Sequence, residues 1–191
     1  MKTFSLYENS VPLDLKNKKK SQQPFSKGVL DGSFAVHDLV NAIHYLHGPL
    51  SAKKAKKLMF YITHLFYKFE DANKEKTHNT DIDAIVDILC TIYYSPYKLN
   101  FSIPFYSDIG INWYSEFTHK MEMFLENNHG IVLLATDKKW TLVKGLRDGD
   151  LLLFSSEYPS YLSRENCISF EEDSSNKVLL QPSKTIFLWT D

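Results

Sequence analysis

The order of the apolar patterns is the feature that most constrains the fold of this chain. From about Ser33 to Asn127, apolar residues recur at steps of three and four, which is the period of an amphipathic helix. After Gly130 they form short runs with β-branched residues, separated by turn residues. Helices followed by strands favour an α+β domain with an antiparallel sheet over alternating βαβ units.

Glycine, proline and serine divide the helical part. The first helix is expected from near Ser33 to Gly48, because glycine suits the left-handed cap and Pro49 cannot continue a helix. Ser51 fits the N-cap of the next helix. The later helices are predicted over Ala52–Asp71, Asp81–Tyr94 and Asn112–Asn127.

The strands are expected to form one sheet at the C-terminal end of a single domain. Asp148-Gly149 is typical of a hairpin turn. Residues 1–191 are expected to form this domain in three parts: an irregular lead-in over 1–30, a mainly helical part over 31–128 and an antiparallel sheet over 129–191. Within the lead-in, Met1–Tyr7 could form a short strand. The predicted strands are Ile131–Ala135, Trp140–Gly145, Leu151–Phe154, Cys167–Phe170, Val178–Gln181 and Thr185–Trp189.

Composition excludes several classes of protein. Hydrophobic residues make up 43% and charged residues 24%, which is enough for a core, and a net charge of −1 gives no global attraction to nucleic acid or an anionic membrane. Two cysteines do not make a disulfide scaffold, and Cys90 and Cys167 are both expected to be buried, inert thiols. Without a signal peptide or an apolar span, the expected location is the cytoplasm.

Two segments carry a pattern of catalytic domains: Asp31–Gly48 (DGSFAVHDLVNAIHYLHG) and Gly130–Ser156 (GIVLLATDKKWTLVKGLRDGDLLLFSS). Together they resemble the papain-like peptidases, and among these the C39-type peptidases that process bacteriocins. In that family a glycine-containing turn brings the catalytic cysteine to the start of a long buried helix. A His-Trp pair opens a later strand, and an Asp or Asn ends the strand after it. The resemblance implies a papain-like fold.

The chemistry of such a site requires three partners. A helix N-terminus favours a thiolate, a histidine exchanges its proton, and an Asp or Asn fixes the tautomer of the histidine. Here Phe34 stands at the nucleophile position with Ser33 beside it, Lys139 replaces the histidine, and Ser155 lies near the expected Asp or Asn. Lysine is normally protonated at neutral pH and is a poor general base.

A glutamine usually supports the oxyanion in this family, but Gln22 and Gln23 lie farther upstream than the motif places it. The resemblance therefore implies a catalytically inactive domain that binds a peptide or protein partner in a regulatory or adaptor role. Its site is expected in a groove between the helices and the sheet. The expected lining is Ser33, Phe34, Lys139, Trp140 and Ser155.

Two alternatives remain open. Ser33 could act as a nucleophile with Lys139 as its base, which would give a non-standard papain-like amidase, peptidase or acyltransferase. The simpler interpretation of Ser33 is a helix N-cap. The chain could also be an interaction module of an unrelated α+β fold, recognised by a first helix that does not pack against the strand of Trp140.

Other residue clusters have simpler interpretations. His37, His44 and His47 share a helix, but no HExxH or paired-cysteine spacing accompanies them, so we expect no metal and no cofactor.

Two lysine-rich stretches, Lys18–Lys20 and the start of the second helix, could attract phosphates or an acidic partner, although a solvated face is simpler. Nucleic acid is not expected, a small molecule stays possible, and no pattern indicates the oligomeric state. The aromatic stretch is interpreted as loop packing or a partner surface. The lysines of the second helix are Lys53, Lys54, Lys56 and Lys57, and the aromatic residues are Tyr93, Tyr94, Tyr97, Phe101, Phe105 and Tyr106.

Overall fold

The computed structural model describes residues 22–26, 34–73, 80–105, 113–137, 139–156, 160–168 and 177–191. Of Phe34, residues 70–73 and residues 80–81 it describes the backbone alone. The short strand predicted for Met1–Tyr7, the run Lys18–Lys20 and Ser33 lie outside the described residues. The described piece of the lead-in, residues 22–26, has no regular secondary structure, as predicted.

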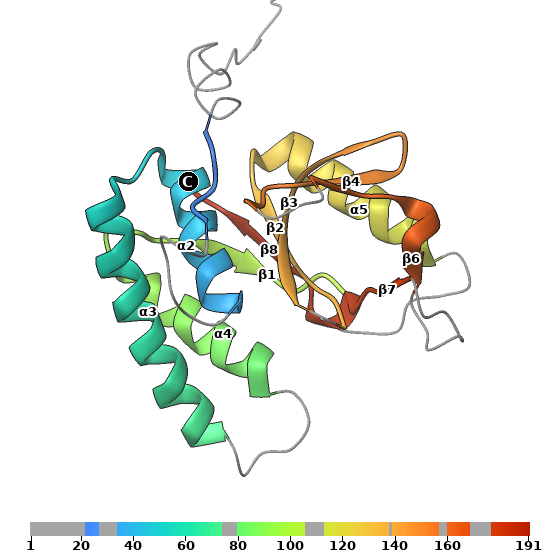
Figure 1. Cartoon of the computed structure of the whole chain (residues 1–191). Coiled ribbons are helices and arrows are strands. Elements are labelled where there is room, and N and C mark those ends of the chain that lie inside the picture. Colours follow the sequence, from blue (N-terminus) through green and yellow to red (C-terminus); the bar gives the residue numbers. More distant parts are fainter. Residues whose placement is uncertain are drawn as a thin grey trace, which may run out of the picture.

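The molecule has three layers, with an antiparallel sheet between a layer of three helices and a single helix (Figure 1). Helices α2 (Phe34–His47), α3 (Ala52–Asn73) and α4 (Thr80–Ile92) form the first layer, and α5 (Trp113–Asn128) covers the other face. The α+β class, with helices first and an antiparallel sheet after them, is therefore confirmed.

The sheet has six strands in the order β1-β8-β2-β3-β4-β5. Every neighbouring pair is antiparallel. Strand β2 lies inside the sheet between β8 and β3, and its five residues are all buried because helices cover both of its faces. The strands are β1 (Asn100–Ser102), β2 (Ile131–Ala135), β3 (Trp140–Arg147), β4 (Asp150–Leu153), β5 (Tyr161–Leu162) and β8 (Ile186–Trp189).

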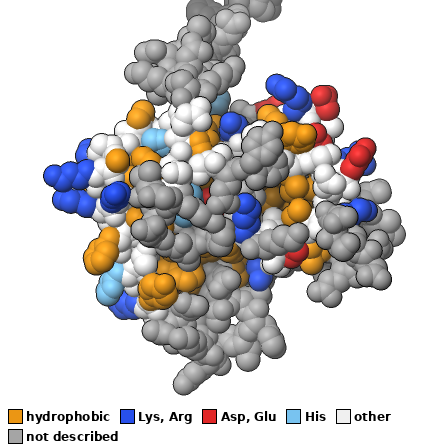
Figure 2. All heavy atoms as spheres, viewed as in Figure 1, with side chains coloured by type: hydrophobic (Ala, Val, Ile, Leu, Met, Phe, Trp, Pro, Cys, Tyr) orange, Lys and Arg blue, Asp and Glu red, His pale blue; other side chains and the backbone are white. Residues whose placement is uncertain are grey.

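The predicted caps and turns are present. Gly48 has a φ of 92°, which is the left-handed conformation that ends α2. The Ser51 hydroxyl accepts a hydrogen bond from the Lys54 amide at 3.3 Å and so caps α3. Asp148 and Gly149 have φ values of 54° and 86°, the signs that a type I′ hairpin turn requires. The outer side of α3 carries the lysines of its first turns, visible at the left edge of Figure 2.

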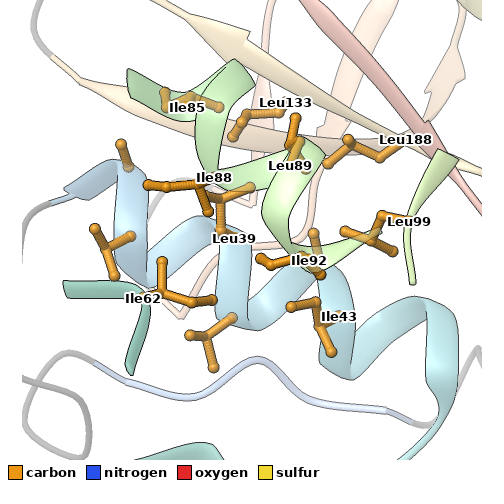
Figure 3. Packing of buried hydrophobic residues seen from close by; sticks show 14 of the residues in the cluster. Leu39, Ile43, Ile62, Ile85, Ile88, Leu89, Ile92, Leu99, Leu133 and Leu188 are labelled. Carbon is orange, nitrogen blue, oxygen red and sulfur yellow. The ribbon is translucent and has the colours of Figure 1, made fainter. Parts of the chain in front are cut away.

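Alternation along β2 divides the core into two clusters. Leu133 and its neighbours two residues away face α2, α3 and α4, whereas Val132 and Leu134 pack with Phe117 and Phe124 of α5. Figure 3 shows Leu133 and Leu188 of the sheet against buried side chains of the helical layer. The labelled helical residues in that view are Leu39, Ile43, Ile62, Ile85, Ile88, Leu89 and Ile92.

Several boundaries differ from the prediction. Strands β1 and β5 were not predicted, and β1 lies within the part predicted as mainly helical, because its partner β8 is remote in the chain. The described residues of the strands expected over Cys167–Phe170 and Val178–Gln181 belong to no strand of the six-stranded sheet, and Ser169 and Phe170 lie outside the described residues. The first residues of these expected strands form a separate parallel pair of β6 (Cys167–Ile168) with β7 (Val178–Leu179). Leu180, which follows β7, pairs with Thr136, which follows β2.

Among the described residues, no helix has the length and apolar character needed to cross a membrane.

Candidate functional site

Helix α2 is the most deeply packed part of the predicted site. Every described side chain from Ala35 to His44 is buried, and α2 packs against both β2 and β3. Trp140 belongs to the same core cluster as the apolar residues of α2. The first helix therefore packs on the strand of Trp140, and the arrangement that would have favoured an unrelated interaction module is not found.

The direction of α2 brings its first turn towards the start of β3. The ring of Tyr45, near the end of α2, lies 4.9 Å from the ring of Phe154. Phe154 in turn donates its amide to the carbonyl of Leu142 at 2.8 Å, beside the middle of β3. In Figure 1 the first turn of α2 lies towards the end of the sheet at which β2 turns into β3.

The turn between β2 and β3 holds the backbone of Lys139 in a fixed position. The Lys139 amide donates to the Thr136 hydroxyl at 3.0 Å, and its carbonyl accepts the Thr136 amide at 2.9 Å. Asp137 joins this turn to β7, because its amide donates to the Leu179 carbonyl at 2.9 Å and its carboxylate accepts the Leu179 amide at 3.2 Å. Lys139 itself is half-buried and directly precedes β3.

The predicted site residues differ in how accessible they are. Trp140 is 8% exposed and faces α2 with Leu142 and Phe154, so substitution of Trp140 acts on the core before it acts on a ligand. Ser155 is half-buried and follows Phe154 directly. Phe34 is the first residue of α2, and Ser33 precedes the described segment.

The two cysteines have different surroundings. Cys90 was predicted to be buried but is exposed, because the inner face of α4 is centred on Ile85, Ile88 and Ile92. Cys167 donates to the Ser163 carbonyl at 3.2 Å, and burial raises the pKa of its thiol to about 11. A thiol with this pKa stays protonated at neutral pH.

Two histidines of α2, His44 and His47, are engaged by the backbone. The Leu50 amide donates to His44 Nδ1 at 3.0 Å, so His44 Nε2 carries the proton and donates to the Gln23 carbonyl at 3.1 Å. Burial lowers the pKa of His44, which favours this neutral tautomer. His47 Nε2 lies 2.9 Å from the Lys98 carbonyl. No group of His, Cys, Asp or Glu in the described part of the chain has a geometry suited to a metal ion.

Asn41 and His44 bind the lead-in segment to α2, a role that the sequence did not indicate. The Phe25 amide donates to Asn41 Oδ1 at 2.8 Å, and Gln22 donates its side-chain amide to the His44 carbonyl. Gln22 is thus held near the end of α2, remote along the helix from the start where an oxyanion-supporting glutamine is needed. The amphipathic pattern could not predict these contacts, because periodicity indicates which face of a helix is buried but not which partner a single polar residue on that face binds.

No family model matches the chain, and no curated protein or solved structure matches it.

Proposed function

We propose that this chain is a catalytically inactive papain-like domain, similar in plan to the C39 peptidases, which binds a peptide or protein partner in a regulatory or adaptor role. One observation carries the proposal. The buried helix α2 lies across β2 and β3, and its first turn points towards the start of β3. A thiol and an imidazole would be needed at Phe34 and Lys139, and neither is present.

The remaining chemistry suits binding. A lysine ammonium and a serine hydroxyl can hold the carbonyl or carboxylate groups of a peptide, and neither attacks an amide without an activating base. The turn that fixes the Lys139 backbone reduces the entropy lost when a ligand binds. The free thiols of Cys90 and Cys167 fit a reducing compartment, for which we propose the cytoplasm.

The spatial part of the proposal can be tested by installing the missing pair. In the double variant Phe34→Cys/Lys139→His, the new imidazole should stabilise the new thiolate. Alkylation by iodoacetamide, followed by mass spectrometry of the peptide that contains position 34, should then extend to lower pH than in Phe34→Cys alone. The variant Phe34→Cys/Lys144→His is the matched control, because Lys144 lies on β3, the strand that begins directly after Lys139. Equal pH profiles in all three proteins would refute the papain-like arrangement.

The binding part needs a separate experiment. A random peptide library displayed on phage should yield sequences that bind the full chain, and Lys139→Ala and Ser155→Ala should weaken the binding. Ser156→Ala and Lys177→Ala are matched controls at exposed positions. Selected peptides that bind all four variants equally well would exclude this site.

The enzyme alternative has its own readout. A serine- or cysteine-reactive activity probe should not label the native chain in an activity-dependent way. Labelling that heat denaturation abolishes and that also disappears in Ser33→Ala or Cys90→Ala would contradict the proposed lack of catalysis, whereas labelling of Cys90 that survives denaturation reflects only its exposed thiol.

A further inference from the structure

A second candidate site lies beside α3, and none of its lining residues belongs to α2 or β3. A pocket of about 350 Å³ opens between α3 and the turn that follows α4. Its lining is mainly apolar and includes the side chains of two lysines. The residues that matter for the argument are Leu58, Ile92, Pro96 and Tyr61, with Lys54 and Lys57.

The lysines give this surface an uncompensated positive charge. Lys53, Lys54, Lys56 and Lys57 are all exposed, and the sequence has no acidic residue from Ala52 to Phe69. None of these lysines forms an ion pair in the part of the chain that the structure describes. Cations in a first helical turn oppose the helix dipole, so their concentration there does not serve the stability of α3.

Exposed aromatic side chains extend the surface beyond the pocket. Phe60 is 79% exposed and Tyr94 is 89% exposed, and Tyr61 and Tyr67 also face solvent. Phe60 follows the lysines along α3, and Tyr94 directly precedes the pocket residues of the turn. In Figure 2 hydrophobic side chains continue along α3 from the lysines at the left edge of the molecule. Large apolar side chains gathered beside a pocket are typical of interaction surfaces.

We propose that this surface binds an acidic segment of a partner protein. One aliphatic or aromatic side chain of that segment enters the pocket, and neighbouring carboxylates pair with Lys54 and Lys57. Complementary charge favours an anionic partner, and the apolar lining selects a partner with a hydrophobic anchor. A ligand that also contacts an exposed aromatic residue outside the pocket, such as Tyr94, must be larger than a small molecule.

A protein segment fits better than the other polyanions. The chain has a net charge of −1, so it lacks the broad positive field that steers nucleic acid. The pocket is concave and mainly apolar, which suits a side chain better than the flat surface of a bilayer. This inference does not depend on the function proposed for the α2–β3 region.

The test uses the full chain and a fluorescein-labelled peptide of Asp and Glu residues around a single Phe. Fluorescence anisotropy should show saturable binding, and replacing the Phe of the peptide by Ser should weaken it. The double variant Lys54→Glu/Lys57→Glu should raise the Kd at least about tenfold. Arg147→Glu/Lys177→Glu alters two exposed residues and changes the net charge equally, and it should leave the Kd within about twofold.

Three results would overturn the proposal. The first is that the Phe peptide does not bind. The second is an equal rise in the Kd for both double variants, which would indicate unspecific electrostatic attraction. The third is tighter, Lys54- and Lys57-dependent binding of single-stranded DNA or of phosphatidylserine vesicles, which would assign the surface to another polyanion. Lys139→Ala should retain peptide binding here, so this inference and the proposed function can fail separately.

Discussion

Asn41 shows how much one buried polar side chain contributes. Its Oδ1 accepts the Phe25 amide, so its Nδ2 must point towards His37 Nδ1, 3.3 Å away. The same Nδ2 lies 3.4 Å from the Phe25 carbonyl, so both polar atoms of the Asn41 side chain contact the lead-in segment. The contacts of Asn41 therefore join the lead-in segment to α2 and to His37.

Replacing Asn41 by Ala should lower the free energy of unfolding by about 1–3 kcal/mol, because it leaves buried polar groups unpaired. Urea denaturation followed by circular dichroism measures the change. Asn100→Ala is a matched control, since Asn100 bonds Asp191 at the exposed surface. A loss in Asn41→Ala no larger than in Asn100→Ala would show that the tether is not structural.

His44 should make stability depend on pH. Burial lowers its folded pKa below the value of 6.5 for an unperturbed histidine, so the unfolded chain takes up the proton more readily between these two values. The free energy of unfolding should be highest above about pH 6.5 and should fall as the pH drops through the folded pKa. Denaturation at a series of pH values should give a shallower dependence for His44→Gln. Removal of an exposed histidine in His64→Gln is the control, and equal slopes for the two variants would contradict the prediction.

The two thiols should differ strongly in reactivity. Cys90 is exposed, whereas Cys167 is half-buried with a pKa of about 11. Iodoacetamide at pH 8 should therefore alkylate Cys90 much faster than Cys167, because Cys90 is accessible, whereas Cys167 is half-buried and its raised pKa keeps the thiol protonated. Mass spectrometry of the native chain and of the single-cysteine variants Cys90→Ser and Cys167→Ser measures the two rates. Faster alkylation of Cys167 than of Cys90 would contradict the half-buried position of the Cys167 thiol.

At the scale of elements, Gly130 sets the distance between α5 and the sheet. A Cβ atom built at Gly130 would lie 2.6 Å from the Leu188 carbonyl oxygen and would also clash with the ring of Phe124. That ring stacks on Phe187 with centroids 4.3 Å apart, so it has little room to yield. A glycine is therefore required where α5 turns into β2.

Gly130→Ala should destabilise the protein by about 1–3 kcal/mol through overpacking. Gly145→Ala is the matched control, since a Cβ atom there would make an ordinary contact at 3.7 Å with Leu152. Thermal unfolding of both variants tests the pair. If Gly145→Ala proves equally destabilising, the close approach at Gly130 is not the cause.

At the scale of the whole molecule, we expect β2 and α2 to be the most stable part of the fold, because helices pack on both faces of β2. Opening β2 disturbs both core clusters, and α2 is buried among β2, β3 and α3. Their amides should therefore exchange only through global unfolding. The edge strand β5 should exchange sooner. Hydrogen exchange with mass spectrometry compares these segments, and exchange of β2 as fast as that of β5 would contradict the layered core.

The sequence by itself determined the order of helices and strands, the caps at Gly48 and Ser51 and the hairpin at Asp148. These features depend on periodicity and on backbone preferences of neighbouring residues, which act locally. For the candidate site, the sequence proposed Lys139, Trp140 and Ser155, and their grouping into one site stays a prediction; the structure shows only that α2 packs on the strand of Trp140.

Only the tertiary structure decided the pairing of β1 with β8, the separate β6–β7 pair, the exposure of Cys90 and the pocket beside α3. Each of these depends on segments that are distant in the chain. The apolar stripe of α4 allowed more than one rotation, and packing against α3 and the sheet selected the one that turns Cys90 outward. Local pattern predicts which side chains can be buried, but contacts between remote segments determine where they lie and which surfaces stay open.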